Sequence, residues 1–245
     1  MKLILTGGIT FFKIRPDLTD TFVLVDSYRG QLLPPQINRL AAGKEFHAEA
    51  NRISSSDCFW YLPERFNGNK LFSYGGAIQF NLFIDANSKS SKNPDIVITG
   101  NGLKMLYKAH ESATQNLQQQ FRANIAENQG WEVDGRNATR GDIMKILADI
   151  DSIMVRACSG TYTSLTQIDQ IELDYAEKET GLTQATSVEQ CVCPMGYRGS
   201  SCEECAAGWY RAEGHGVFGI CKKCDCGGNE ECEDGTGKCK VSYRL

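Results

Sequence analysis

The chain has 245 residues, 41% of them apolar and 23% charged, which is enough for one sizeable core plus a small module. The net charge of −4 and the pI near 5.5 do not favour binding to nucleic acid or to an anionic membrane. No apolar run reaches the roughly 20 residues that a membrane-spanning helix needs.

Residues 1–185 are mostly typical of β-strands. The stretch 3–12 has the length of a signal-peptide core, but it contains Thr6-Gly7-Gly8 and no small-x-small cleavage site follows, so we interpret it as a strand. Strict alternation predicts a strand over 77–85, with one face formed by Ile78, Phe80, Leu82 and Ile84. The Gln-rich stretch 117–125 is ambiguous, but alternation of Phe121, Ala123 and Ile125 favours a strand. Further strands are predicted at 21–25, 95–102 (ending in a turn), 131–135 and 171–175.

One helix is predicted after residue 139. Apolar residues follow the i, i+3, i+4, i+7 spacing of a buried helical stripe at Ile143, Ile146, Leu147 and Ile150. Thr139 can cap this helix, and Asp142 can complete a box-like start. Many strands with one short helix predict an all-β sandwich of two sheets.

The cysteines divide the chain into two parts. Nine of eleven lie between Cys191 and Cys239, and the first 190 residues contain only Cys58 and Cys158. The spacing of Cys202, Cys205, Cys221 and Cys224 fits a four-cysteine zinc site. Five interleaved cysteines and the scarcity of histidine favour disulfides instead, which replace a core in small secreted modules.

Several of these segments resemble a known pair of modules. Residues 191–211 resemble the second half of a laminin-type EGF-like repeat, as it resumes after a laminin IV type A domain. Upstream, 61–69, 73–76, 139–150 and 155–157 resemble signature stretches of that domain, whereas 1–50 match poorly. The resemblance implies a jelly-roll-like β-sandwich over 1–186, the second half of an EGF-like repeat over 187–223, and the truncated start of a second repeat over 224–245.

The resemblance also implies a disulfide pairing. It gives Cys193–Cys202, Cys205–Cys221, Cys224–Cys232 and Cys226–Cys239, with turns supported by Gly196, Gly199 and Gly208. Three cysteines stay unassigned: Cys58 and Cys158 can pair with each other, or one of them can take Cys191. Both ends of the repeat pattern look cut, so we expect a fragment of a larger mosaic protein. The loop 227–231 lacks the acidic, Asn-containing signature of nidogen-binding repeats, so nidogen binding is not implied.

Two short motifs lie at the predicted helix start. Arg140-Gly141-Asp142 is the tripeptide of integrin ligands, but its position at a helix start favours a structural role over an adhesive one. Asn137-Ala138-Thr139 is the N-x-S/T sequon of the chain, and a glycan on Asn137 would crowd the triplet. An aromatic group can stack on sugars or fill the core, and we favour the core; its members are Phe59, Trp60, Tyr61, Phe66, Phe72 and Tyr74.

Catalysis finds little support. The histidines His47, His110 and His215 have no nucleophile or metal motif beside them. The carboxylate pairs Asp57/Glu64 and Asp149/Asp151 are better explained by solvation. No spaced calcium loop joins Asp85, Asn87 and Asp95. We therefore expect no enzymatic activity, no metal and no cofactor.

The resemblance implies a structural and interaction module of a secreted basement-membrane glycoprotein, as in laminin chains and perlecan-like proteins. In this reading, a disulfide-stapled rod carries an inserted globular domain that supports matrix assembly and cell adhesion. The partners would be other extracellular matrix proteins or cell-surface receptors. The alternatives are a carbohydrate-binding β-sandwich and an intracellular zinc-binding domain.

Overall fold

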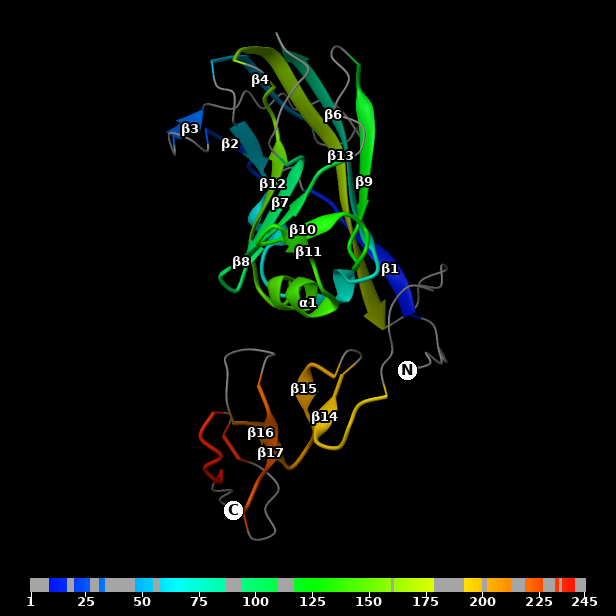
Figure 1. Cartoon of the computed structure of the whole chain (residues 1–245), viewed down its shortest axis with the longest axis vertical. Helices are drawn as coiled ribbons and strands as arrows, with labels where there is room; N and C mark the ends of the chain where they lie inside the picture. Colours follow the sequence, from blue (N-terminus) through cyan, green and yellow to red (C-terminus); the bar gives the residue numbers. More distant parts are fainter. Residues whose placement is uncertain are drawn as a thin grey trace. The chain divides into compact units, whose positions relative to one another are not determined.

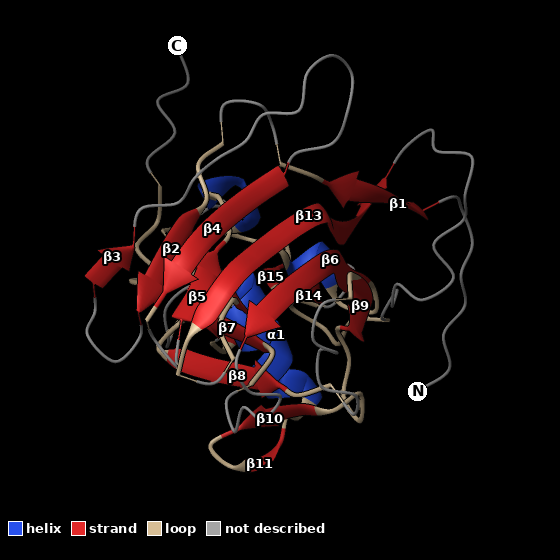
Figure 2. Cartoon of the chain, turned by 90° about the horizontal axis from the view of Figure 1, so that it is seen from above, coloured by secondary structure: helices blue, strands red, loops and turns tan. Residues whose placement is uncertain are grey.

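The structure is a computed structural model that describes residues 9–16, 20–26, 31–33, 47–54, 58–86, 94–109, 117–159, 161–178, 192–199, 202–212, 219–226, 232–233 and 235–240. The chain divides into two compact units, one of residues 8–185 and one that contains residues 186–245. The larger unit is a sandwich of two antiparallel sheets with one α-helix among its described residues (Figures 1 and 2). The predicted β-sandwich with one short helix is therefore confirmed.

The first sheet has five strands, with the long strand β13 at its centre. β13 pairs with β6 along one edge, and β9 pairs with the other side of β6. On its second edge β13 has two partners in succession, β4 and then β1. The bounds of the five strands are β1 (Ile9–Ile14), β4 (His47–Ile53), β6 (Ala77–Ala86), β9 (Gln119–Asn124) and β13 (Thr163–Lys178).

An irregularity in β13 marks the change of partner. The register with β6 shifts between Asp169 and Glu172, and Gln170 has a φ of 50°. The pairing with β4 ends at Asp169, and the pairing with β1 includes Leu173 and the residues after it. A bulge adds a residue and bends the strand. It thus resets which side chains of β13 face the core just where β1 joins the sheet.

The second sheet has eight strands in the order β11-β10-β8-β7-β12-β5-β2-β3. Two of its inner strands, β5 and β7, are short runs of mostly buried residues. The bounds are β2 (Val23–Asp26), β3 (Gln31–Leu33), β5 (Cys58–Tyr61), β7 (Ile96–Gly100), β8 (Leu103–Tyr107), β10 (Trp131–Val133), β11 (Arg136–Asn137) and β12 (Ile150–Arg156).

The helix α1 (Arg140–Ala148) ends before Ile150, the last residue of the apolar stripe that predicted it. Ile143, Ile146 and Leu147 are fully buried, as expected. Ile150 is also buried, but it is the first residue of β12 and not part of the helix, so its assignment to the helical stripe was wrong. Asp149 leaves helical geometry with φ −157°, and the amide of Ile150 then donates to the carbonyl of Gly68 over 2.9 Å. A burial pattern alone cannot separate a helix end from an adjoining strand.

The core between the sheets follows from alternation. On β6 the side chains of Ile78, Phe80, Leu82 and Ile84 are each no more than 3% exposed. Phe80 stacks on Phe121 of β9 with ring centroids 5.4 Å apart. The predicted inward face of β6 and the strand reading of the Gln-rich segment are both confirmed.

The stretches 61–69 and 73–76 are connectors that tie the strands to α1. The first stretch contains the 3-10 helix η1 (Glu64–Phe66), and a second 3-10 helix, η2 (Leu71–Ser73), ends at the first residue of the second stretch. Between them, the amide of Gly68 donates to Ile150 over 2.8 Å and that of Lys70 to Leu147 over 2.7 Å. The amide of Gly75 donates to Ile125 over 2.9 Å. These bonds satisfy backbone groups that burial would otherwise leave unpaired, so these two stretches have an architectural role.

The described residues of the cysteine-rich unit form short hairpins, and few of their side chains are buried. Its strands are β14 (Tyr197–Arg198), β15 (Glu204–Cys205), β16 (Trp209–Arg211) and β17 (Cys221–Lys223). Gly196 has a φ of 92°, and a Cβ there would lie 2.5 Å from Cε3 of Trp209. Gly199 and Gly208 also have positive φ, at 98° and 77°. Among the described residues of the whole chain, no helix is long and apolar enough to cross a membrane.

Candidate functional site

The Arg-Gly-Asp triplet is part of the first turn of α1. Thr139 is the N-cap: its hydroxyl accepts from the amide of Asp142 at 3.2 Å, and the Asp142 carboxylate accepts from the Thr139 amide at 2.9 Å. This capping box is the start that the sequence predicted. The hydroxyl of Thr139 also donates to the same carboxylate at 2.6 Å.

Arg136 also bonds the Asp142 carboxylate. Its two terminal nitrogens donate to the two oxygens over 2.7 and 3.1 Å, a bidentate pair. The hydrogen bonds from Arg136 and then from Thr139 lower the pKa of Asp142 well below its ordinary value, against a small opposing effect of burial. The guanidinium of Arg140 lies 5.5 Å from the ring centre of Tyr74. Both charged side chains of the triplet thus already have partners within the fold, an arrangement that fits a structural role.

The aromatic group belongs mainly to the core. Phe59, Trp60, Phe66 and Tyr74 are no more than 6% exposed. Trp60 donates from its indole nitrogen to the hydroxyl of Thr166 at 3.4 Å. Tyr61 is half-buried, and Phe72, 37% exposed, packs edge-on against Tyr175. The six rings therefore do not form a shared exposed platform on which a sugar could stack.

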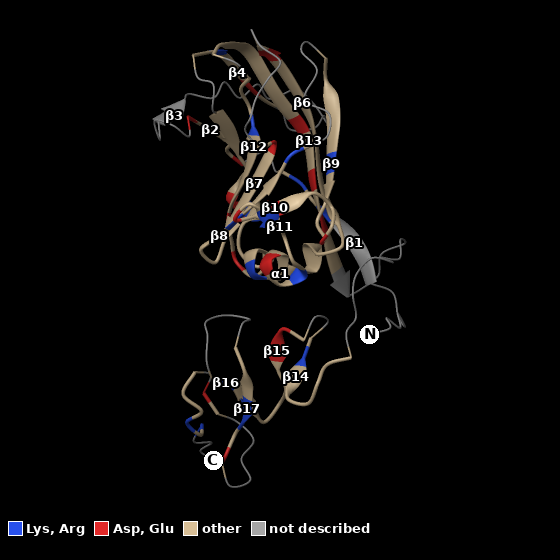
Figure 3. Ribbon diagram, in the orientation of Figure 1, with Lys and Arg blue, Asp and Glu red and all other residues tan. Residues whose placement is uncertain are grey.

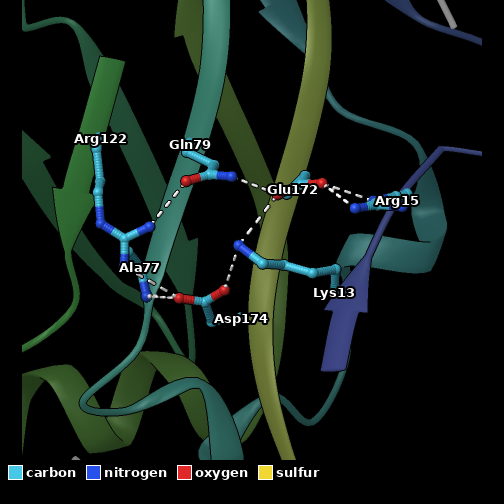
Figure 4. Close-up of polar contacts among 7 residues, drawn as sticks. All are labelled: Lys13, Arg15, Ala77, Gln79, Arg122, Glu172 and Asp174. Atoms are coloured by element: carbon cyan, nitrogen blue, oxygen red, sulfur yellow. Dashed lines mark hydrogen bonds and ion pairs between the residues drawn. The ribbon is translucent and has the colours of Figure 1, made fainter. Parts of the chain in front are cut away.

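A charged network that the sequence did not single out crosses the outer face of the five-stranded sheet (Figure 4). The neighbouring side chains of Ile78 and Leu173 point into the core, so by alternation Gln79, Glu172 and Asp174 lie on the opposite face. Acidic and basic bands lie on the strands of this sheet (Figure 3), and Arg122 of β9 lies 3.4 Å from Asp174 of β13. Lys13 bonds both Glu172 at 3.0 Å and Asp174 at 2.9 Å.

The network extends over four strands. Arg122 of β9 donates to Gln79 of β6 at 2.8 Å, and Gln79 in turn donates to Glu172 of β13. Arg15, just after β1, donates to the same carboxylate at 2.6 Å. Asp174 also accepts from the amide of Ala77 at 3.1 Å. The groups bond one another, so the network joins β1 to the rest of the sheet.

The charges in this network shift each other's protonation. Burial favours the neutral form of Glu172, but hydrogen bonds and charge from Lys13 and Arg15 outweigh it and lower the pKa of Glu172. Burial likewise opposes the charge on Lys13, but Asp174 and Glu172 outweigh it and raise the pKa of Lys13. Both shifts stabilise the ionised pair. A reactive acid or base would instead need its pKa moved toward neutrality.

Arg156, in the stretch 155–157, belongs to a buried ion pair. Arg156 and Asp95, 4% and 5% exposed, form a direct ion pair. Asp95 also accepts from the amide of Ala109 at 2.7 Å. Burial, and then the charge of Asp95, raises the pKa of Tyr107. Three residues were considered as calcium ligands. Asp95 already bonds Arg156 and the amide of Ala109, and Asp85 accepts from the hydroxyl of Ser164. Asn87 lies outside the described residues.

Among the described residues, ten cysteines form five disulfides. Cys58 and Cys158, both fully buried, are joined to each other with Cα atoms 5.2 Å apart. In the cysteine-rich unit the bonds are Cys193–Cys202, Cys205–Cys221, Cys224–Cys232 and Cys226–Cys239. The four sulfurs of the zinc alternative are thus divided among three disulfides. Cys191 lies outside the described residues.

The remaining candidates are not brought together. Asp149 and Asp151 are exposed, Asp57 lies outside the described residues, and so do His110, His215 and the side chain of His47. Within the described part of the chain, no group of three or more His, Cys, Asp or Glu residues is placed to hold a metal ion. Asn137 is exposed on β11.

The fold and its bonded cysteines define a disulfide-stabilised β-sandwich module followed by a small cysteine-rich unit. The family model described as Laminin B (Domain IV) matches residues 59–189, so the chain belongs to this family. The predicted resemblance to a laminin IV domain is therefore confirmed.

Relatives show where such domains occur. The chain is 36% identical over 223 residues to the Basement membrane proteoglycan of Caenorhabditis elegans, an alignment that covers 90% of this chain and 7% of that protein. It is 33% identical over 196 residues to Laminin subunit alpha-1 of Mus musculus, covering 76% of this chain and 6% of that protein. The chain thus spans only a small part of the curated relatives that it matches.

A solved structure shows the same fold. The L4b domain of human laminin alpha-2 has a TM-score of 0.59 to this chain at 20% identity, covering 69% of this chain and 100% of that domain. The similarity extends over the whole of that domain, which supports treating the β-sandwich as a single module.

Proposed function

We propose that this chain is a structural and interaction module of a secreted basement-membrane protein. The observation that carries the proposal is the 36% identity to a basement membrane proteoglycan over 90% of the chain, which extends past the β-sandwich. The proposal places the chain in the extracellular matrix, with other matrix proteins or cell-surface receptors as partners. It assigns the chain no enzymatic role and no cofactor.

We further propose that the cysteine-rich unit is built of laminin-type EGF-like repeats. The pairing Cys193–Cys202 and Cys205–Cys221 is what the second half of one repeat requires. Cys224–Cys232 and Cys226–Cys239 interlock as in the first half of the next repeat. Repeats that contact only their neighbours stack into a semi-rigid rod. In this proposal the β-sandwich is the globular insertion that such a rod displays.

The internal bonding of the sandwich supports this role. Three of its ion pairs lie within the fold: Asp142 with Arg136, Asp95 with Arg156, and Glu172 with Lys13. Cys58–Cys158 adds a covalent bond between β5 and the segment after β12. A module held in this way keeps its shape outside the cell, where disulfides persist.

The test is to produce the chain in animal cells behind a heterologous secretion signal and to map its cysteines by mass spectrometry without reduction. We expect the five disulfides above and no bound metal. The secreted protein should also be retained in the detergent-insoluble matrix laid down by cultured cells. The Cys205→Ala/Cys221→Ala variant removes one disulfide of the cysteine-rich unit. It should leave the sandwich folded but lower the retention of the protein in the matrix. A protein with reduced cysteines and stoichiometric zinc would overturn the proposal.

A further inference from the structure

Asn137 lies on a strand at the end of the eight-stranded sheet, as far as the structure describes the chain. Its strand, β11, is the terminal strand in the sheet order, and β10 is its neighbour. Figure 2 shows the β10–β11 hairpin at the periphery of the unit. A sheet edge offers unpaired backbone groups to other chains, so proteins usually cover or shorten it. β11 has two residues, so the edge is already short.

The side chain of Asn137 points to solvent. Its Cα lies opposite that of Glu132, and both residues are exposed. The next residue, Ala138, is 4% exposed, and its amide donates to the carbonyl of Trp131 at 2.8 Å. Successive side chains of a strand alternate between faces, so the backbone holds Asn137 outward. Within the described part of the chain, no hydrogen bond engages its side-chain amide.

We propose that Asn137 carries an N-linked glycan that covers this sheet edge and the start of α1. The inference rests on the proposed function, because only a chain that enters the secretory route meets the glycosylation machinery. The sequon supplies the acceptor. In the transfer, the amide nitrogen of Asn137 bonds to the anomeric carbon of a lipid-diphosphate-linked oligosaccharide. The bond from that carbon to the diphosphate oxygen breaks, the lipid diphosphate leaves with the electron pair, and the amide loses one proton.

The geometry of Thr139 fixes the order of events. A sequon needs a hydroxyl two residues after the asparagine, but in the folded chain this hydroxyl donates to Asp142 at 2.6 Å and accepts from its amide at 3.2 Å. The glycan is therefore added before the capping box of α1 closes. Once the helix has formed, the glycan lies three residues from Arg140 and hides the triplet from large partners.

The test uses the whole chain, made in animal cells behind a heterologous secretion signal. Lysate and medium are each treated with peptide-N-glycosidase and compared by gel mobility and by mass of the peptide that contains Asn137. Asn137→Gln and Thr139→Ala should each abolish the mobility shift. Thr139→Ser keeps both the sequon and the cap, and it should keep the shift. Trypsin cleavage after Arg136 should be several-fold slower in the glycosylated protein than in the folded protein made without glycan.

The outcomes separate the two proposals. A shift in lysate or medium that both sequon variants abolish supports the glycan. A secreted, correctly disulfide-bonded protein without any shift would overturn the glycan and leave the proposed function standing. A lysate protein that carries the glycan but has reduced cysteines supports the glycan and contradicts the proposed function. Equal trypsin cleavage with and without glycan would overturn the covering of the edge.

Discussion

The disulfide between Cys58 and Cys158 should be a main source of stability for the β-sandwich. It joins the first residue of β5 to the segment after β12, and it closes a loop of 100 residues. The two segments are also held by the amide of Ala157, which donates to the carbonyl of Cys58 at 2.8 Å. The folded strands therefore stay aligned without the bond, and its removal acts mainly on the unfolded chain.

Loop entropy sets the size of the effect. Closing a loop of about 100 residues lowers the entropy of the unfolded chain by the equivalent of roughly 4.7 kcal/mol, and removal of native disulfides typically costs about 2–5 kcal/mol. We expect the Cys58→Ala/Cys158→Ala variant to lose about 3–5 kcal/mol in free energy of unfolding. Alanine is the suitable replacement because both positions are fully buried and a serine hydroxyl would need a partner there.

The assay is urea unfolding at pH 7, followed by the fluorescence of Trp60 and Trp131, which are buried in this unit. A Trp209→Phe background removes the signal from the cysteine-rich unit. The matched control is Cys226→Ala/Cys239→Ala, which opens a loop of only 13 residues in that unit and should leave the midpoint of the sandwich unchanged. A loss below about 1 kcal/mol for the first variant, at an unchanged denaturant slope, would refute the entropic reasoning.

Three further predictions concern charged groups. Arg156→Met should destabilise the sandwich by about 3–5 kcal/mol in the same urea assay, because it leaves Asp95 buried and without its ion-pair partner. A loss no larger than that of an exposed substitution in the same unit, such as Lys104→Met, would contradict this. Asp142→Asn should cost about 1 kcal/mol at pH 7, because the neutral amide loses the charge pairing with Arg136 and weakens the capping box. Because folding lowers the pKa of Asp142, the contribution of this carboxylate to stability is complete above its ordinary pKa of 3.8 and is lost as the pH falls below that value. The melting temperature of the variant should therefore depend less on pH below 3.8 than that of the wild-type protein. Melting temperatures that fall in parallel for the two proteins would argue against the pairing of Asp142 with Arg136. Lys13→Met should let the pKa of Glu172 rise toward its ordinary 4.5, measured by NMR titration; an unchanged value would show that Lys13 does not hold that carboxylate.

Local patterns in the sequence predicted the individual elements well. Alternation placed β6 and β9, and apolar spacing with Thr139 and Asp142 placed the start of α1. These features depend on residues a few positions apart, so a short window contains their cause. The error at Ile150 arose at a boundary, where helix and strand bury the same kind of side chain. β13 was predicted only over 171–175, because the irregularity near Gln170 interrupts its alternation.

Contacts between residues far apart in the sequence could not be predicted from local patterns. Arg15 and Glu172 are 157 positions apart, and nothing near either residue indicates the other. Glu172 and Asp174 alternate with buried Ile171 and Leu173, which marks them as the outer face of a strand. That signal alone does not say which cations they meet, because the partner depends on which strand lies beside β13.

The sequence by itself determined the type of most elements, the division between a β-rich part and a cysteine-rich part, and the family resemblance. These follow from composition, periodicity and ordered motifs along the chain. Only the tertiary structure decided that Cys58 meets Cys158, that Asp142 is held by Arg136, and that four strands share one charged network. Each depends on how strands distant in sequence are ordered and aligned within a sheet, and that register is set by the packing of the whole core.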